Sequence, residues 1–152
     1  MSTKLTTDAF RNDGMLPERH SRWGGNVSPP LRWAGIPAGT KSLALVVDDP
    51  DAPSGLLVHW LLYDLAPNAD RIEENQPASQ DLPNGARQAR NGSGAVGYGG
   101  HQPPSGTHRY FFHPYAVDRD PKACPPESAV RIRPGARKPY LGNTTHGTVP
   151  TT

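Results

Sequence analysis

Two segments hold the side chains best suited to bind a ligand. The segment from Gly97 to Tyr110, GYGGHQPPSGTHRY, combines glycines and prolines with the imidazoles of His101 and His108. Glycine lets backbone approach a ligand closely, proline fixes the shape of a loop, and an imidazole can hydrogen-bond an anion near neutral pH. The segment from Val47 to Trp60, VDDPDAPSGLLVHW, places carboxylates ahead of an apolar run that His59 interrupts. We expect the two segments to face each other across one binding site.

A metal site is the first alternative, because imidazoles and carboxylates are ligands for zinc and iron. The close-spaced pairs that usually organise such sites, as in H-E-x-x-H on a helix, are missing from this sequence. We therefore predict neither a metal nor another cofactor. The side chains considered as ligands are Asp49, Asp51, His59, His101, His108 and His113.

Sequence motifs typical of enzymes are either missing or lie in the wrong structural context. Residues 92–97 satisfy G-x-G-x-x-G, but no apolar strand precedes them and the following glycines and prolines forbid a helix at their end. Loop serines lie outside any G-x-S-x-G motif. An acid–base hydrolase that uses Asp49 with His59 stays open, supported by residue types alone. The sequence otherwise predicts a binding protein that is not an enzyme.

Composition favours a single β-rich domain. The 152 residues include 18 prolines and 16 glycines, too many for a helical bundle. Residues 122–152 carry a net charge of +4 and the preceding body carries −2, so the body is no platform for nucleic acid. Residues 1–10 contain no apolar signal-peptide core, and no later run is long enough to span a membrane. These features predict a cytoplasmic protein without integral membrane association.

Three strands must position the candidate site. The run Lys41 to Asp48 is short, apolar and bounded by turn residues, and Leu56 to Leu65 is apolar on both faces, as in a central strand or a buried helix. A third strand is predicted from His108 to Val117, with Pro114 marking an edge, a bulge or a strand end. Residues 66–91 read as a surface connection. Residues 121–152 show neither helical nor strand periodicity, which predicts a poorly ordered tail.

Several motifs together resemble the phosphatidylethanolamine-binding protein family, and most closely its bacterial Raf kinase inhibitor-like branch. The motifs are NVSPPLRW at 26–33, PAGTKSLALVVDDPDAP at 37–53, VHW at 58–60, and the GYGG, PP and GTHRYFF run within 97–112. The combination of DPDAP with G-x-HRY is highly specific. The resemblance covers roughly residues 10–118 in order.

The resemblance implies an all-β fold in which a large antiparallel sheet packs on a smaller sheet, with a small pocket for a phosphate-type anion. It also implies cis peptide bonds at Pro50 and Pro104. The family's pocket residues carry over to Asp49, Asp51, Pro53, His59, Pro104, His108 and Tyr110.

We expect this pocket to be complete without any lysine or arginine. An imidazole of His59 or His108, oriented by Asp49, would present N–H to a phosphate oxygen, and backbone N–H groups at Gly99 and Gly100 would complete the concavity. Such a site should bind simple anions weakly, and better at lower pH, where imidazoles are charged.

The chain departs from the family after Asp118. Family members continue into a further strand and a C-terminal helix, whereas residues 119–152 match neither. We therefore divide the chain into a family domain at 1–118 and a divergent basic, proline-rich tail at 119–152 that lacks the helix. The abrupt change favours the hypothesis of a shifted reading frame or a recent divergence.

The predicted function is non-enzymatic binding of a phosphate-containing small molecule, a phospholipid head group or a phosphorylated peptide. Inhibition of a protein kinase or protease through the protein surface is the alternative that the resemblance suggests. A metal-dependent or acid–base hydrolase is the remaining alternative function.

Overall fold

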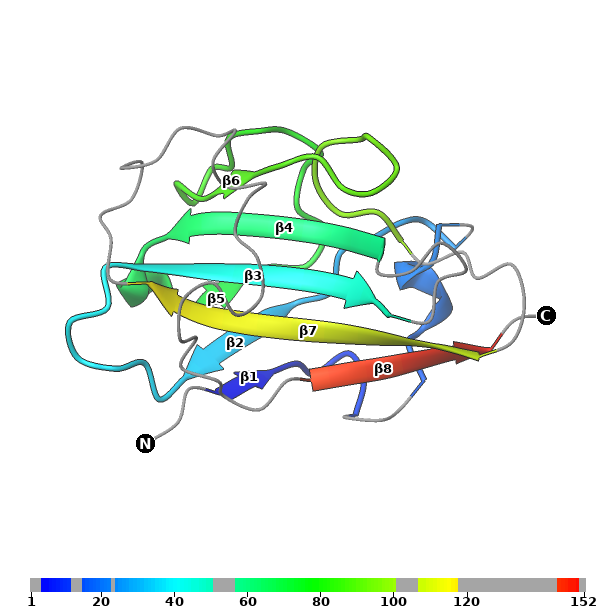
Figure 1. Cartoon of the computed structure of the whole chain (residues 1–152), viewed down its shortest axis with the longest axis horizontal. Coiled ribbons are helices and arrows are strands. Elements are labelled where there is room, and N and C mark those ends of the chain that lie inside the picture. Colours follow the sequence, from blue (N-terminus) through cyan, green and yellow to red (C-terminus); the bar gives the residue numbers. More distant parts are fainter. Residues whose placement is uncertain are drawn as a thin grey trace.

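Two antiparallel sheets pack face to face in the computed structural model, which describes residues 4–11, 15–22, 24–50, 57–100, 107–117 and 145–150 (Figure 1). The five-stranded sheet has the order β6-β4-β3-β7-β8, formed by β3 (Ser42–Asp49), β4 (Leu57–Leu65), β6 (Arg87–Gln88), β7 (Thr107–Val117) and β8 (Thr145–Pro150). The small sheet has the order β1-β2-β5, formed by β1 (Lys4–Thr6), β2 (Leu31–Ala34) and β5 (Arg71–Ile72). Short 3-10 turns occur at η1 (Glu18–His20) and η2 (Pro67–Ala69). The predicted all-β fold, with a large sheet on a smaller one, is confirmed.

The three strands predicted from apolar runs are β3, β4 and β7, and they form the middle of the large sheet. All eight residues of β3 are buried, because the strand has a strand neighbour on each side and an apolar cluster on each face. This burial explains why its sequence shows a continuous apolar run where a half-exposed strand would alternate. Its odd-numbered apolar residues, Leu43, Leu45 and Val47, face the small sheet and join the main core with Trp33 and Trp60.

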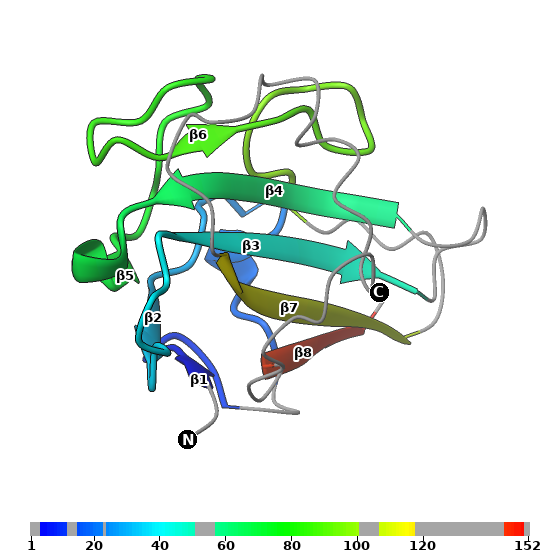
Figure 2. The same cartoon turned by 60° about the vertical axis from the view of Figure 1, so that its left-hand side comes forward.

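The short strands of the small sheet, and the short strand β6 at the edge of the large sheet, were not predicted. Two- and three-residue strands carry no periodicity to recognise, and β5 and β6 lie inside the stretch 66–91 that we interpreted as a surface connection. Their positions depend on pairing with strands distant in sequence. In Figure 2, β1, β2 and β5 lie to one side of the long strands, as a separate layer.

Pro114 lies inside β7, opposite Leu45 of β3. On its other side, β7 pairs with β8 only from Thr107 to Phe112. In the part of the chain that the structure describes, Pro114 therefore lies where β7 has no neighbour on that side, and its missing N–H breaks no ladder there. This agrees with the predicted edge position.

The prediction of no strand within 121–152 is wrong for Thr145–Pro150, which forms β8 beside β7. The segment THGTVP has no apolar alternation, so its strand conformation follows from pairing with β7 and not from local pattern. The boundary placed at 118/119 and the expected loss of a C-terminal helix concern residues outside the described ranges. Within those ranges no helix is long and apolar enough to cross a membrane.

Two irregularities in the β3–β4 pair change the direction of β4 side chains. Val47 pairs with Trp60 and Asp48 pairs with Val58, so His59 is an extra residue on β4, as in a β-bulge. A second irregularity, between Leu43 and Leu45, contains Asp64 with a φ of 59°. Bulges commonly re-aim a side chain next to a binding site, and here the re-aimed residue is His59.

Candidate functional site

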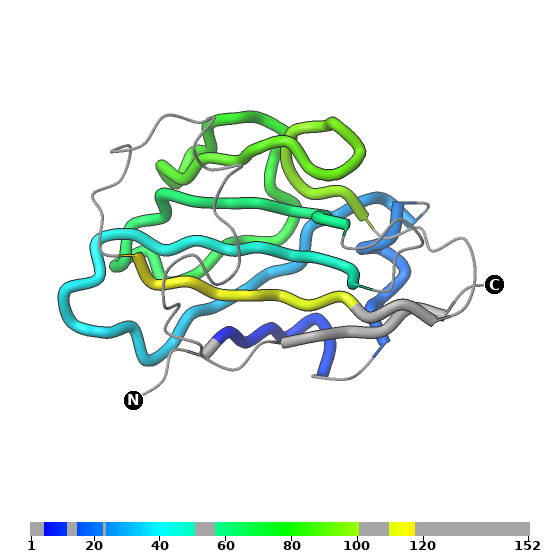
Figure 3. The backbone as a smooth tube through the Cα atoms, viewed as in Figure 1, coloured from blue at the N-terminus to red at the C-terminus, as the bar shows by residue number. Residues whose placement is uncertain are grey.

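A cavity of about 160 Å³ opens where the N-terminal segment, the start of β4 and the loop after β6 meet. Figure 3 shows the blue N-terminal tube approaching the yellow-green segment that ends at Gly100. Three separate parts of the sequence therefore contribute to one hollow. The lining residues are Arg22, Leu57, Val58, His59, Asn91, Ser93, Gly99 and Gly100.

The ring of His59 has one defined tautomer when it is neutral. Its Nδ1 lies 2.9 Å from the carbonyl oxygen of Gly99, and because a carbonyl can only accept, Nδ1 carries the proton. Neutral His59 therefore has its lone pair on Nε2. This buried Nε2 has no hydrogen-bond partner in the described part of the protein. Leaving a buried polar atom unsatisfied costs about 1–3 kcal/mol, which makes it a candidate contact point for a ligand.

Burial lowers the pKa of His59 below its ordinary value of 6.5, since desolvation penalises the imidazolium. The hydrogen bond to Gly99 and the charge of Asp49 act in the opposite direction, and the nearby charge of Arg22 lowers the pKa further. The ring is therefore mostly neutral at neutral pH and gains a second donor, Nε2–H, only when it is protonated.

Arg22 supplies a permanent positive charge to the cavity. One of its terminal nitrogens lies 3.3 Å from the hydroxyl oxygen of Ser93, and that hydroxyl donates to Oδ1 of Asn91 over 2.6 Å. The Asn91 amide nitrogen donates in turn to the carbonyl of Gly97. The expectation of a pocket without lysine or arginine is wrong, because the N-terminal segment folds back onto the loop after β6.

The expected backbone donors are already occupied. The N–H of Gly99 donates to the carbonyl of His59 over 2.8 Å, and the N–H of Gly100 donates to Oδ1 of Asn26. These groups therefore hold the wall of the cavity together and are not free for an anion, which corrects that part of the sequence prediction. A Cβ on Gly100 would lie 2.7 Å from the Arg22 nitrogen and 2.8 Å from the His20 oxygen, so this close approach requires glycine.

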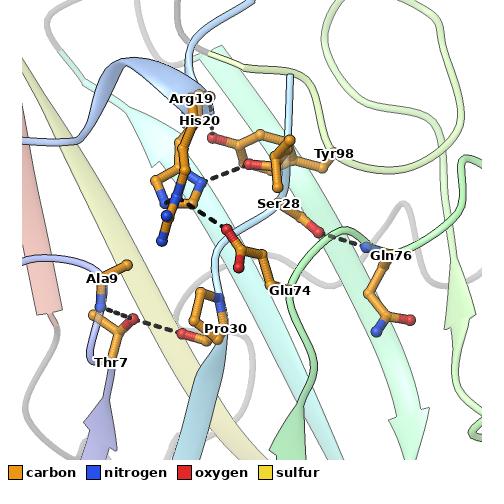
Figure 4. Close-up of polar contacts among 10 residues, drawn as sticks. Thr7, Ala9, Arg19, His20, Ser28, Pro30, Glu74, Gln76 and Tyr98 are labelled. Atoms are coloured by element: carbon orange, nitrogen blue, oxygen red, sulfur yellow. Dashed lines mark hydrogen bonds and ion pairs between the residues drawn. The ribbon is translucent and has the colours of Figure 1, made fainter. Parts of the chain in front are cut away.

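His20 fixes the segment that carries Arg22 (Figure 4). Its buried ring donates from Nδ1 to the carbonyl of Val27 over 2.7 Å and accepts at Nε2 from Nε of Arg19 over 3.3 Å. The Tyr98 hydroxyl donates to the His20 carbonyl over 2.7 Å. Burial lowers the pKa of His20, so the neutral ring is the form that holds this segment in place.

Two of the predicted site residues lie around His59. Asp49 is buried at the end of β3, and its charge acts on His59. The ring of Tyr110 on β7 meets the His59 ring edge-on, with centroids 5.0 Å apart.

Other predicted positions cannot be placed around the cavity. The backbone of His108 lies in β7, opposite Val149, but its side chain is outside the description. Asp51, Pro53, Pro104 and His101 also lie outside the described residues. The expected cis bond at Pro50 is absent, because no described peptide bond is cis.

The candidate metal ligands do not gather where the structure describes them. No group of three histidine, cysteine, aspartate or glutamate side chains in the described ranges could hold a metal ion. His113 lies instead on the other face of the sheet, where its Nε2 contacts the Asp48 carboxylate at 3.1 Å.

Sequence reasoning missed Arg22, Asn91 and Ser93. The turn signal N-G-S-G at 91–94 marked a loop, but nothing local indicated that Asn91 and Ser93 would face a cavity. Arg22 lies far from them in sequence, and their contact depends on the folded arrangement.

Stability should fall as the pH drops below about 6.5. The pKa values of His20 and His59 lie below 6.5 in the folded protein, so the unfolded chain binds more protons once the pH is below 6.5. The contribution of the two neutral rings is complete above that pH and is lost as the pH falls toward the folded pKa values. The slope reaches at most about 1.4 kcal/mol per pH unit for each histidine.

Urea denaturation across this pH range measures the slope. His20→Asn and His59→Asn should each reduce it, while His113→Gln, on the other face of the sheet, serves as the matched control. A free energy of unfolding that does not change below pH 6.5 in the wild type would contradict the assignment.

Comparisons with known proteins agree with the fold and extend over both sheets. A family model described as phosphatidylethanolamine-binding protein matches residues 6–149, which runs beyond the boundary that we placed at Asp118. A UPF0098 protein from Methanothermobacter thermautotrophicus is 46% identical over 134 residues, covering 88% of this chain and 83% of the relative. A UPF0098 protein from Aquifex aeolicus is 38% identical over 120 residues, covering 78% of this chain and 70% of the relative.

Solved structures similar to this chain belong to the same family. YbcL from E. coli, described as a member of the mammalian PEBP family, superposes with a TM-score of 0.83 at 27% identity and covers 100% of both chains. The phosphatidylethanolamine-binding protein homologue CT736 from Chlamydia trachomatis gives a TM-score of 0.78 at 31% identity, with 99% of each chain covered. This chain belongs to the phosphatidylethanolamine-binding protein family.

Proposed function

We propose that this protein is a non-enzymatic binding protein whose cavity takes a phosphate-type oxyanion, carried by a small molecule or a lipid head group. The observation that carries the proposal is that His59 lines the cavity and that its buried Nε2 has no hydrogen-bond partner among the described residues. A ligand oxygen would satisfy this atom. The family resemblance supports a ligand-binding role, and the chemistry of the lining supports an anion.

The charges around the cavity favour an anion whose binding is accompanied by protonation of His59. Arg22 contributes a permanent positive charge at the lining, and protonation of His59 would add a second one. Hydrogen bonds between charged partners are roughly twice as strong as neutral ones. Because Nδ1–H is committed to Gly99, only the imidazolium can donate from Nε2 to an oxyanion. Binding should therefore be coupled to proton uptake by His59.

The same arrangement argues against nucleophilic catalysis by the lining residues. Ser93 donates its hydroxyl hydrogen to the Asn91 amide oxygen and accepts from Arg22. An amide oxygen does not take up a proton as a general base must, so Ser93 has no activating partner in this network. Binding without turnover is the function that these contacts support.

Titration with sulfate tests the proposal, since sulfate keeps its charge throughout the pH range in which a histidine titrates. We expect the backbone amides of Gly99 and Gly100 to shift in an NMR titration, with affinity at least about tenfold higher near pH 5.5 than near pH 8. His59→Gln should remove most of this pH dependence. His113→Gln should retain it, because that histidine lies on the opposite face of the sheet.

Two results would contradict the proposal. One is a sulfate affinity that is the same at both pH values in the wild type. The other is a His59→Gln variant that behaves like His113→Gln. Hydrolysis of a phosphate monoester that disappears in Asp49→Asn would instead favour an acid–base hydrolase.

A further inference from the structure

The outer face of the small sheet carries two arginines directly opposite each other. Arg32 of β2 pairs in register with Arg71 of β5, and on its other side with Thr6 of β1. All three residues are exposed, whereas their strand neighbours Leu31 and Ile72 are buried in the core. One row across three strands therefore presents a hydroxyl and two guanidinium groups to the outside.

This pairing is unfavourable for the sheet itself. Like charges directly opposite each other on antiparallel strands repel. Arg71 gains one partner, Glu73, at 3.4 Å, but both side chains are more than half exposed and such contacts contribute little. The side chain of Arg32 makes no hydrogen bond or ion pair in the part of the chain that the structure describes. A guanidinium held beside another without a carboxylate partner is suited to an external oxyanion.

A row of opposite charge lies next to the arginines. Asp8 lies two residues after Thr6, just past β1, and Glu73 lies two residues after Arg71, just past β5, and both line the same hollow as the arginines. The hydroxyl of Thr7 donates to the carbonyl of Pro30 and accepts from the N–H of Ala9, which ties the segment carrying Asp8 to the residue just before β2 (Figure 4). Asp8, like Arg32, has no ion-pair partner among the described residues.

Both rows line one hollow of about 180 Å³. Its walls include Arg32 and Arg71 together with Asp8 and Glu73, and no lining residue is shared with the cavity at His59. The four charged groups sum to zero. A simple anion would gain from the arginines and be repelled by the acids, whereas a ligand with both charges would match both rows.

We propose that this hollow is a second binding site, for a small zwitterion that carries an oxyanion and a primary ammonium group. The guanidinium groups of Arg32 and Arg71 bind the oxyanion, with the Thr6 hydroxyl as a further donor. The carboxylates of Asp8 and Glu73 bind the ammonium group. The site does not depend on His59 or on the function proposed for the first cavity.

An NMR titration of the full chain at about pH 8, where neutral His59 disfavours anions in the first cavity, tests the second site. The probes are phosphoethanolamine and its two separate halves, inorganic phosphate and ethanolamine. We expect phosphoethanolamine to shift the backbone amides of Thr6, Arg32 and Arg71, and to bind at least about fivefold more tightly than either half. The Gly99 amide reports separately on the first cavity.

Three substitutions make the test specific. Arg32→Gln should weaken phosphoethanolamine binding about tenfold, and Asp8→Asn should reduce it to the level of phosphate. Arg11→Gln is the matched control, because Arg11 is also exposed and does not line the hollow. Arg32→Gln relieves a repulsion, so its fold should be retained, and dispersed amide peaks would verify this.

The proposal is overturned if phosphoethanolamine leaves the three amides unshifted, or if Arg32→Gln binds like Arg11→Gln. Equal affinity for inorganic phosphate and phosphoethanolamine would also overturn it, since the acidic row would then make no contribution.

Discussion

Replacing Trp60 with alanine lowers the free energy of unfolding by about 3–5 kcal/mol, the range for deleting a large buried aromatic side chain. Trp60 is fully buried in the main core, and its indole N–H donates to Oε1 of Gln88 over 2.7 Å. Its ring also meets the ring of Tyr98 edge-on, with centroids 5.4 Å apart. The substitution therefore removes packing, leaves the Gln88 oxygen without its donor, and loosens Tyr98.

The Trp60→Ala substitution should also affect the first cavity, because Tyr98 connects the two. The Tyr98 hydroxyl holds the carbonyl of His20, two residues before Arg22. We expect Trp60→Ala to weaken sulfate binding as well as stability. Trp60→Phe is the matched variant, because it keeps an aromatic ring in the core while it loses the N–H and only part of the packing, with an expected cost of about 1–3 kcal/mol. Urea denaturation measures both, and a loss below about 1 kcal/mol for Trp60→Ala would show that this core is not closely packed.

Replacing Arg22 with glutamine weakens sulfate binding by about 10- to 100-fold, because a charged hydrogen bond contributes about 1.5–3 kcal/mol. The side chain lines the cavity and its terminal nitrogen is held by Ser93 at 3.3 Å, so little ordering is needed when an anion enters. The stability should change little, since this hydrogen bond is exposed.

Arg90→Gln is the control for this prediction. Arg90 lies next to Asn91 and donates to the carbonyl of Gly94 over 2.7 Å, but it does not line the cavity. Calorimetric titration with sulfate compares the two variants at one ionic strength, because exposed charges are screened by salt. Equal weakening in both would mean that Arg22 acts only through the general positive potential.

The sequence predicted the parts of the fold that carry a local signal. The apolar runs of β3, β4 and β7 are long enough to recognise, and these strands form the middle of the large sheet. Strand β8 was not predicted because THGTVP becomes a strand only through pairing with β7. The two-residue strands β5 and β6 were not predicted either, because they too depend on pairing with a distant strand.

The candidate site was predictable only where a motif marked it. His59, Asp49 and Tyr110 were identified from the VHW, DPDAP and HRY motifs, and the structure brings the three together. Arg22 carries no motif, and its position depends on how His20 anchors the N-terminal segment. The N–H groups of Gly99 and Gly100 donate to acceptors within the protein itself. These are tertiary contacts that no local pattern reveals.

Titration of the His59 ring by side-chain NMR, with and without sulfate, shows whether an oxyanion binds beside this ring. We expect a pKa below 6.5 in the free protein, because the ring is buried, and a higher pKa with sulfate bound, because the anion stabilises the imidazolium. By linkage, each unit of increase corresponds to a roughly tenfold tighter binding of sulfate to the protonated form. A His59 pKa that sulfate leaves unchanged would contradict the assignment of this cavity as an oxyanion site.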